Sequence, residues 1–361
     1  MINKIVRALF FKSLFFTIVI HMATLHSEPI DVVYTWVDGK DQEWQQARDK
    51  FFSQCQSLLQ NKDANVKNRF RNRDELKYSL RSIYKFASFI NHIYIITSGP
   101  SQRPKWLKND PKITLISHQE IFPNKEHLPT FNSQAIEANL HRIPNLSERF
   151  LYLNDDFFLG MPVTSEDFFS KSGKICIFFT RDKVATGAQV LGESAFDSAW
   201  KNSNALLNAH YKPEKRYQVA HAPYSLTKSL MQEVEARFSR VFQLVSSHKF
   251  RMPSDFTLTN GLIQYHALYT KKGKSIKVPL TMIKLNEKLD KNNKQFEKVK
   301  NTPYKFFCVE DCSSEDSEEV DLALAQFFEA YFPEAAPWEQ PVIDMTKWPH
   351  NQTRGKIGIR E

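Results

Sequence analysis

Glycine is scarce in this chain, with 10 residues among 361. Folds that hold phosphates in glycine-rich loops need several glycines close together, because only a backbone without side chains can wrap a phosphate so closely. The nearest approach to such a loop is Gly187-Ala-Gln-Val-Leu-Gly192, followed by Glu193 and Ser194. It lacks the lysine with which a P-loop reaches the terminal phosphates. The sequence therefore excludes a P-loop.

Cysteine is also rare, and the four residues are Cys55, Cys176, Cys308 and Cys312. No two of them form a CxxC pair, which argues against a structural zinc site. Cys308 and Cys312 are close enough in sequence to form a small disulfide if the chain reaches an oxidising compartment. The alternative is four buried thiols, which we favour slightly over the disulfide.

The sequence has no block of Lys and Arg, no zinc-finger spacing and no internal repeat. Its formal charge is nevertheless +9, with a pI near 9.2. This excess implies an anionic partner such as an acidic polymer, an anionic lipid or nucleotide phosphates. Because the basic residues are spread along the chain, we expect no nucleic-acid partner. A hydrophobic content of 42% is sufficient for a substantial core.

The first 27 residues have the composition of a targeting segment. Three basic residues precede an apolar run from Ser13 to Leu25, which is too short for a comfortable membrane span. A basic start, an apolar centre and the small residue Ser27 resemble a secretory signal peptide, with a signal anchor or a buried helix as alternatives. We expect residues 1–27 to be a signal peptide or signal anchor, so that the protein is exported or tethered to a membrane.

Strand and helix patterns alternate from Ile30 to Asp156. Runs of apolar, β-branched and aromatic residues predict strands at 30–37, 92–97, 113–117 and 150–153. Helical patterns lie between them at 41–59, 74–83 and 132–141. Strands separated by helices pair in parallel through right-handed crossovers. The sequence therefore predicts an α/β fold with a mostly parallel sheet flanked by helices.

The pattern is looser after about Ser170, and we expect a helical C-terminal part. Apolar residues at every fourth position from Leu226 to Phe238 predict a helix with Ser225 as its N-cap. The acidic stretch 310–319 is expected to be a solvated loop, and 321–332 an amphipathic helix. We expect one domain over residues 28–335 and a C-terminal tail over 336–361.

Two adjacent acids, Asp155 and Asp156, follow the predicted strand that ends near Asn154. In open α/β sheets, ligands bind beyond the carboxyl ends of the strands. Paired carboxylates there suit a hard divalent cation, which takes oxygen ligands and often bridges to substrate phosphates. The alternative is a plain turn, since Asn and Asp are common turn formers.

His221 lies just before the predicted helix that starts at Ser225. Because helix N-termini favour anions, a histidine beside a bound phosphate could act as an acid, a base or a phosphate carrier. The alternative is a hydrogen-bonded histidine at the surface, which is the usual role of a histidine that has no other site residue beside it in the sequence. Downstream, Ser246-Ser-His-Lys-Phe-Arg251 is a basic cluster, or otherwise a solvated run of charge.

Several strings together resemble the Stealth family, whose members are hexose-1-phosphate transferases. These strings lie in four blocks: Asp31-Val-Val-Tyr-Thr-Trp-Val-Asp-Gly39; then Arg69-Phe70, Asp74-Glu-Leu-Lys-Tyr-Ser-Leu-Arg81, His127-Leu-Pro-Thr-Phe-Asn-Ser133, Ala135-Ile-Glu137, His141-Arg-Ile-Pro144 and Tyr152-Leu-Asn-Asp-Asp156; then Ala220-His-Ala-Pro223 and His248-Lys-Phe-Arg251; and finally Lys305-Phe-Phe-Cys308. The resemblance covers residues 30 to 335, and it implies that 28–335 is a catalytic sugar-phosphate transferase domain.

The resemblance implies a Rossmann-like, glycosyltransferase-A-like core. It also implies a nucleotide-sugar donor of the UDP-hexose type, whose sugar moves together with its inner phosphate to a glycan hydroxyl in capsular, exopolysaccharide or surface glycan synthesis. Two other functions stand as alternatives: a metal-dependent glycosyltransferase that forms a plain glycosidic bond, and a non-catalytic carbohydrate-binding protein.

The resemblance also assigns roles to residues. His221, Arg251 and Asp156 are expected to be catalytic, and Asp155 with Asp156 to hold Mg²⁺ or Mn²⁺ or contact the acceptor. An arginine suits the transferred phosphate because its planar fork binds two oxygens. Donor or substrate binding is expected of Trp36, Asp38, Gly39, Arg69, Asp74, Asn132, Ser133 and Asn154.

Two features do not follow the family pattern. The second block commonly has an aspartate where this chain has Asn72 and no cation where it has Arg73. If the family uses that acid near the metal or the sugar, donor choice or metal affinity differs here. Because bacterial nucleotide-sugars are cytosolic, an exported enzyme is awkward. The segment 1–27 would then anchor a catalytic domain at the cytoplasmic face of the inner membrane, or the donor would be supplied elsewhere.

Overall fold

A five-stranded sheet forms the centre of the molecule in the computed structural model, which describes residues 28–55 and 66–341. Its strand order is β3-β2-β1-β4-β8. The pairs β3–β2, β2–β1 and β1–β4 are parallel, and only β4–β8 is antiparallel. The strands are β1 (Ile30–Thr35), β2 (Ile90–Thr97), β3 (Ile113–Ser117), β4 (Arg149–Asn154) and β8 (Tyr224–Thr227). The predicted α/β class with a mostly parallel sheet is confirmed.

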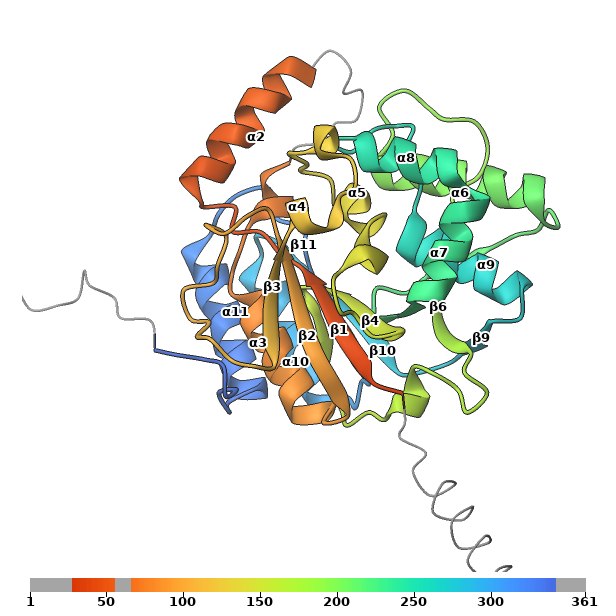
Figure 1. Cartoon of the computed structure of the whole chain (residues 1–361). Helices are drawn as coiled ribbons and strands as arrows, with labels where there is room; N and C mark the ends of the chain where they lie inside the picture. Colours follow the sequence, from red (N-terminus) through yellow and green to blue (C-terminus); the bar gives the residue numbers. More distant parts are fainter. Residues whose placement is uncertain (1–27, 56–65, 342–361) are drawn as a thin grey trace, which may run out of the picture.

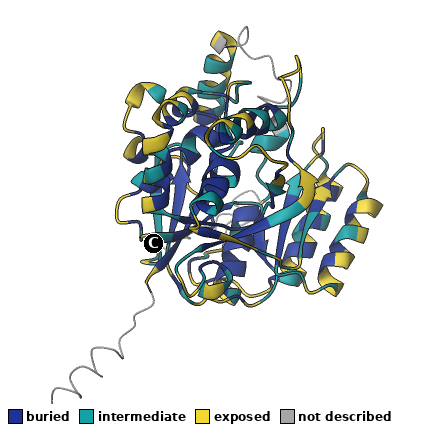
Figure 2. Cartoon of the chain, turned by 90° about the vertical axis from the view of Figure 1, so that its right-hand side faces the viewer, coloured by how far each residue is buried: buried dark blue, intermediate teal, exposed yellow. Residues whose placement is uncertain are grey.

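Apolar strands explain why this sheet lies in the core. Val32, Val33, Leu151 and Leu153 are completely buried, as expected for parallel strands covered on both faces. Figure 2 shows the buried strands at the centre and the exposed residues on the outer faces of the helices. The connecting helices of the first half are α2 (Gln42–Cys55), α3 (Glu75–Phe86), α4 (His118–Ile121) and α5 (Ser133–Glu137), with 3-10 turns η2 (Lys67–Phe70), η3 (Lys125–His127) and η4 (Leu140–Arg142).

Two smaller sheets extend the fold. One has the order β10-β11-β5 and the other β7-β6-β9. Their strands are β5 (Phe157–Leu159), β6 (Ile175–Lys183), β7 (Tyr217–Val219), β9 (Gly273–Ile276), β10 (Leu280–Leu285) and β11 (Phe306–Asp311). The sequence patterns did not predict these six strands. Most are short, and their partners are distant in the chain.

The remaining helices cover these sheets and fill the C-terminal half (Figure 1). They are η5 (Ser165–Asp167), α6 (Ala195–His210), α7 (Lys228–Arg237), α8 (Ser239–Ser247), the π-helical turn η6 (Leu258–Leu262), α9 (Ile263–Tyr269), α10 (Leu289–Asn301) and α11 (Glu318–Tyr331). No helix among the described residues is long and apolar enough to cross a membrane. The expected signal segment 1–27 lies outside the described residues.

Three predicted boundaries were wrong. Ser225 is not an N-cap: it lies in β8, and the helix starts three residues later, with Thr227 accepting a hydrogen bond from the Leu230 amide. The spacing of apolar residues from Leu226 onward predicted one continuous helix, because the buried strand β8 is followed directly by α7. The predicted helix 132–141 consists of α5 and a separate 3-10 turn. The acidic stretch 310–319 ends β11 and begins α11, so only its middle is a loop.

The segment 336–340, which we assigned to the tail, packs against the domain. Trp338 is buried, and its ring meets Tyr84 edge-on at 5.7 Å. Glu339 forms an ion pair with Arg81 at 2.8 Å, and both side chains are 7% exposed. The folded part of the chain therefore continues at least to residue 340.

Candidate active site

The carboxyl ends of β1 and β4 meet at one rim of the central sheet. Thr35, the last residue of β1, is opposite Asn154, the last residue of β4. The segment Trp36 to Gly39 and the pair Asp155–Asp156 follow directly. Because the two strands are parallel neighbours, the first and second blocks of the family resemblance end side by side. The prediction that both open on the same rim is confirmed.

Asp155 and Asp156 form the tight turn between β4 and β5. The chain leaves the central sheet here and enters the β10-β11-β5 sheet, where Phe157 is opposite Cys308 of β11. The Val309 amide donates to the Asp156 carbonyl at 3.0 Å, and the Cys308 thiol donates to Asp156 Oδ2 at 3.3 Å. The turn is therefore held from β11 by both backbone and side chain.

This turn carries a concentration of negative charge. Burial raises the pKa values of both Asp155 and Asp156 above the ordinary range, and the Asp156 charge raises that of Asp155 further. Burial, followed by the charge of Asp155, raises the pKa of Glu75 at the start of α3 to about 8. Asp156 Oδ1 is buried without a hydrogen-bond partner among the described residues. A cation at this place would satisfy the free oxygen and offset the repulsion.

The donor set fits a hard divalent cation. Mg²⁺ is commonly bound through one or two carboxylates, with waters and substrate phosphates as its other ligands. Among residues 28–55 and 66–341, no three His, Cys, Asp or Glu side chains gather as the ligands of one ion. Asp155 and Asp156 would supply two carboxylate groups to such an ion.

His221 lies near this turn. Its ring is 5.9 Å from the ring of Phe157, the residue after Asp156, and 6.3 Å from that of Phe196. Burial lowers the pKa of His221; Glu310 opposes this shift, while Arg251 and Lys284 add to it. The histidine is therefore neutral at neutral pH, as a general base must be. It precedes strand β8 and not a helix, so the helix N-terminus that we expected beside it is absent at that position.

Arg251 lies close enough to His221 to affect its pKa. Its guanidinium donates to the Ser133 hydroxyl at 2.9 Å. The segment carrying it is fixed by Asp255, a completely buried carboxylate that accepts from His248 at 2.6 Å, from Asn132 at 3.0 Å and from the Met252 amide at 2.9 Å. The structure thus joins the two halves of the sequence at the start of α5.

A buried glutamate, Glu137, lies between these groups and was not predicted as a site residue. Its Oε2 accepts from the Thr259 hydroxyl and its Oε1 from that of Tyr152. Burial raises the pKa of Glu137, against the opposing effects of Thr259 and Arg251. Tyr152 also contacts Thr35 at 3.1 Å and Asn154 at 3.0 Å. The sequence string Ala135-Ile-Glu137 could have indicated this role, because a glutamate that follows apolar residues in a short helix can be buried with them.

The segment after β1 is ordered by its own contacts. Trp36 is buried, and its indole nitrogen has no partner among the described residues. Gln102 binds the backbone of Asp38 on both sides, accepting from its amide at 2.6 Å and donating to its carbonyl at 3.2 Å. A Cβ atom on Gly39 would lie 1.8 Å from the Phe70 carbonyl oxygen. Gly39 is therefore required by the close approach of η2, the turn that also carries Arg69.

The other predicted donor or substrate residues differ in their accessibility. Asn154 and Ser133 lie at the rim and contact Tyr152 and Arg251. Asn132 is completely buried, and its carboxamide is used by the Gln134 amide and by Asp255, so it supports its neighbours from within. Asp74 is exposed at the start of α3 with a left-handed backbone, φ 63°.

Arg73, which replaces a residue that the family resemblance led us to expect, has a structural role. Its side chain is 4% exposed and pairs with Asp311 at the end of β11 and with Asp321 in α11. Asn72 accepts from the Asp74 amide at 3.0 Å. The departure in the second block therefore coincides with ion pairs that tie the start of α3, where Glu75 lies, to β11.

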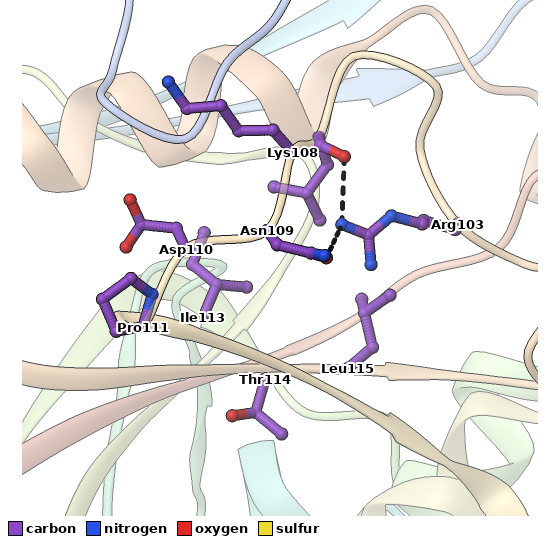
Figure 3. A pocket seen from close by; sticks show the side chains of 9 residues that line it. Arg103, Lys108, Asn109, Asp110, Pro111, Ile113, Thr114 and Leu115 are labelled. Carbon is purple, nitrogen blue, oxygen red and sulfur yellow. Dashed lines mark hydrogen bonds between the residues drawn. The ribbon is translucent and has the colours of Figure 1, made fainter.

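A pocket of about 490 Å³ lies away from these groups, along edge strand β3 (Figure 3). Arg103 lines it and donates to the Leu107 carbonyl at 3.1 Å and to Asn109 at 2.9 Å. The other lining residues are Lys108, Asp110, Pro111, Ile113, Thr114 and Leu115. None of the predicted site residues lines it.

Cys176 and Cys308 are buried free thiols, and Cys312 is free and exposed. The Cys308–Cys312 disulfide is absent from the structure. Cys308 faces Asp156 from within β11, whereas Cys312 lies beyond the end of that strand.

Four models of one protein family match successive parts of the chain. Conserved region 1 of the Stealth proteins matches residues 28–51, region 2 matches 69–177, region 3 matches 220–268 and region 4 matches 297–349. The chain belongs to the Stealth family. Each Stealth region supplies part of the rim: β1 and its extension, the Asp155–Asp156 turn, His221 with Arg251, and β11.

Curated relatives support the same family. An exopolysaccharide phosphotransferase of Streptomyces coelicolor is 36% identical over 315 residues, which cover 86% of this chain and 57% of that protein. The exopolysaccharide phosphotransferase CpsY of Mycobacterium tuberculosis is 34% identical, over 88% of this chain and 59% of that protein. One from Nocardia farcinica is 33% identical, over 86% and 61%. The chain thus spans somewhat more than half the length of these relatives.

Proposed function

We propose that this protein transfers a sugar-1-phosphate from a nucleotide-sugar to a hydroxyl group of a glycan, forming a phosphodiester in exopolysaccharide synthesis. The observation that supports this most directly is that two Stealth regions distant in sequence supply one rim. Region 2 contributes the Asp155–Asp156 turn, and region 3 contributes both the His221 ring against Phe157 and Arg251, which is within electrostatic reach of His221. The relatives, which are named exopolysaccharide phosphotransferases, support the reaction class.

In this proposal, Arg251 binds the phosphate that is transferred. Its planar guanidinium can donate to two phosphate oxygens, and the bond to Ser133 holds one edge of it in place. Glu137, buried nearby, would orient Arg251 by its charge. The guanidinium is therefore oriented before the donor phosphate binds. Positioning and electrostatic stabilisation of this kind are the main sources of catalysis in phosphoryl transfer.

His221 accepts the proton of the acceptor hydroxyl. The bond from the acceptor oxygen to the inner phosphorus forms, while the bond from this phosphorus to the oxygen of the nucleoside monophosphate breaks. The proton remains on His221, and the nucleoside monophosphate leaves with the electron pair. The lowered pKa of His221 keeps it neutral and ready for this role.

Asp155 and Asp156 would hold Mg²⁺ or Mn²⁺, which neutralises charge on the diphosphate when bound. The free Asp156 Oδ1 and the raised pKa values of the pair support this assignment. Trp36, Asp38 and Gly39 at the end of β1 would face the nucleotide.

Identification of the released nucleotide tests the reaction. The full chain is incubated with metal, a panel of nucleotide-sugars and glycan acceptors, and the products are analysed by mass. We expect UMP, or the corresponding monophosphate, and an acceptor that gains sugar and phosphate together. Release of UDP with a plain glycosidic bond would indicate a glycosyltransferase instead, and absence of turnover with every donor would favour a carbohydrate-binding protein.

A further inference from the structure

Almost all the net charge of the protein is concentrated in one segment. Between residues 271 and 305 there are eleven lysines and three acids, a net charge of +8 out of the formal +9 of the whole chain. Basic residues occur throughout the sequence, but over the rest of the chain taken together they are nearly equal in number to the acids. The segment contains no arginine. It covers β9, β10 and α10, whose lysines are exposed up to Lys300.

The lysines of α10 form a stripe on its outer face. Asn292, Phe296 and Val299 are buried and define the inner face. Lys291, Lys294 and Lys298 recur at intervals of three and four residues, which places them together on the opposite side. We call these three residues the lysine stripe. Like charges at such spacing destabilise a helix, so an unoccupied stripe is unfavourable.

The acids of the segment do not neutralise the stripe. Glu297 forms an ion pair with Lys300 at 2.9 Å, and Glu287 accepts from the Ser314 amide at 2.7 Å. Asp290 lies in the first turn of α10, where its negative charge interacts favourably with the helix dipole. No ion pair is recorded for Lys291, Lys294 or Lys298 among the described residues.

The basic segment is connected to the candidate active site through β10. Lys284 in this strand is 3.9 Å from Glu310 and contributes to the lowered pKa of His221. From Lys284 the chain passes Lys288 and enters α10. Positive charge therefore continues from the catalytic histidine outward over the surface, in the direction that an acceptor chain could follow.

We propose that the lysine stripe binds a polyanionic glycan, the growing acceptor whose phosphodiester linkages each carry one negative charge. This inference rests on the proposed function. Lysines on flexible stems suit a repeated charge on a mobile chain, because each ammonium interacts as a point charge without requiring a fixed geometry. The continuity with Lys284 and His221 favours the acceptor over an anionic lipid surface, which would have no need of a path into the site.

Binding of a defined polyanion tests the proposal independently of catalysis. The full chain is titrated with dextran sulfate and, as a neutral reference, with dextran of the same length. We expect salt-sensitive binding of dextran sulfate only. The triple variant Lys291→Glu, Lys294→Glu, Lys298→Glu should bind at least about tenfold more weakly. A control triple, Lys105→Glu, Lys171→Glu, Lys215→Glu, changes the net charge equally at scattered exposed sites and should bind nearly as tightly as the wild type.

Turnover with a short, uncharged acceptor should be the same in the wild type and in both triple variants, because the stripe is outside the reacting groups. If none of the three proteins turns over this acceptor, the proposed reaction is rejected, and the result of the binding experiment still stands. Equal weakening in the two variants, or equal binding of dextran, would overturn the proposal. So would lysine-dependent binding to phosphatidylglycerol vesicles with unchanged binding of dextran sulfate, which would assign the stripe to a lipid surface.

Discussion

At the scale of single residues, the candidate site brings together ionisable groups whose pKa values are shifted in opposite directions. Asp155 and Asp156 in the turn after β4 and Glu75 at the start of α3 are close enough to repel one another, and each has a raised pKa chiefly because of burial. The pKa of His221 shifts in the opposite direction, because burial, with a smaller contribution from Arg251, lowers it and keeps the imidazole neutral. Such opposed shifts in one place are typical of functional sites.

Replacement of Asp156 by alanine should abolish turnover while the fold persists. The reason is that this carboxylate supplies the free buried oxygen expected to bind the cation. Wild-type turnover should require Mg²⁺ or Mn²⁺ and cease in excess chelator. Asp49→Ala, at an exposed position on α2, is the control and should leave the rate unchanged. Full activity of the wild type in chelator would disprove the metal assignment.

His221→Ala and Arg251→Ala should each reduce turnover by at least about a hundredfold, the lower scale for a positioned acid–base group. Steady-state rates measure this loss, with circular dichroism as the check on folding. A near-normal rate in either variant would remove that residue from the mechanism. A trapped phosphohistidine–sugar adduct on the wild type would show that His221 carries the phosphate and does not act as the base.

The pH dependence of turnover should reveal His221. Because burial lowers its pKa below the ordinary 6.5, the neutral form persists to lower pH, and the rate should fall only as the pH drops through that lowered pKa. Lys284→Gln removes a cation that lowers this pKa, so the acid limb should move to higher pH. A shift of the limb to lower pH in this variant, in rate profiles at saturating metal, would contradict the assignment.

At the scale of elements, β11 positions the acidic turn although it is some 150 residues away in sequence. It binds the Asp156 backbone through Val309 and the Asp156 side chain through Cys308. Its end is tied to the start of α3 by the Arg73–Asp311 pair at 2.5 Å. The Arg251 segment is held in the same manner by the buried Asp255. The rim is thus built by connections between elements of different sheets.

Cys308→Ala should lower turnover about tenfold, the scale of a lost hydrogen bond to a charged group. Cys308→Ser retains a donor and should remain within about threefold of the wild type. The measurements are the rate at saturating donor and the affinity for Mn²⁺, which should weaken in the alanine variant alone. If serine behaves like alanine in both, Cys308 acts through packing and not through its hydrogen bond.

At the scale of the whole molecule, the C-terminal segment closes the outside of α3. Arg81 is buried and binds Glu339, Glu329 and the Phe332 carbonyl. These contacts connect residues about 250 positions apart. Ala336 and Trp338, in the same segment as Glu339, are buried in the main hydrophobic cluster around the central sheet. The chain therefore needs residues beyond 335 to complete its core.

Glu339→Gln should lower the free energy of unfolding by about 2 kcal/mol, because the buried Arg81 loses one of its two carboxylate partners and keeps only Glu329. Urea denaturation measures the change. Glu334→Gln, at an exposed position nearby, is the control and should alter stability by less than about 0.5 kcal/mol. Equal stability of the two variants would mean that the segment contributes little to the fold.

The sequence by itself determined the parallel half of the fold and the rim where the site lies. Its apolar strand runs and the acids that follow them are local features, and parallel neighbours necessarily bring their carboxyl ends together. Only the tertiary structure decided the role of Glu137, Glu75, Cys308 and Arg73. Each of these residues interacts with a partner from a distant element. The position of that partner depends on how the sheets and helices pack, and it cannot be read from spacing along the chain.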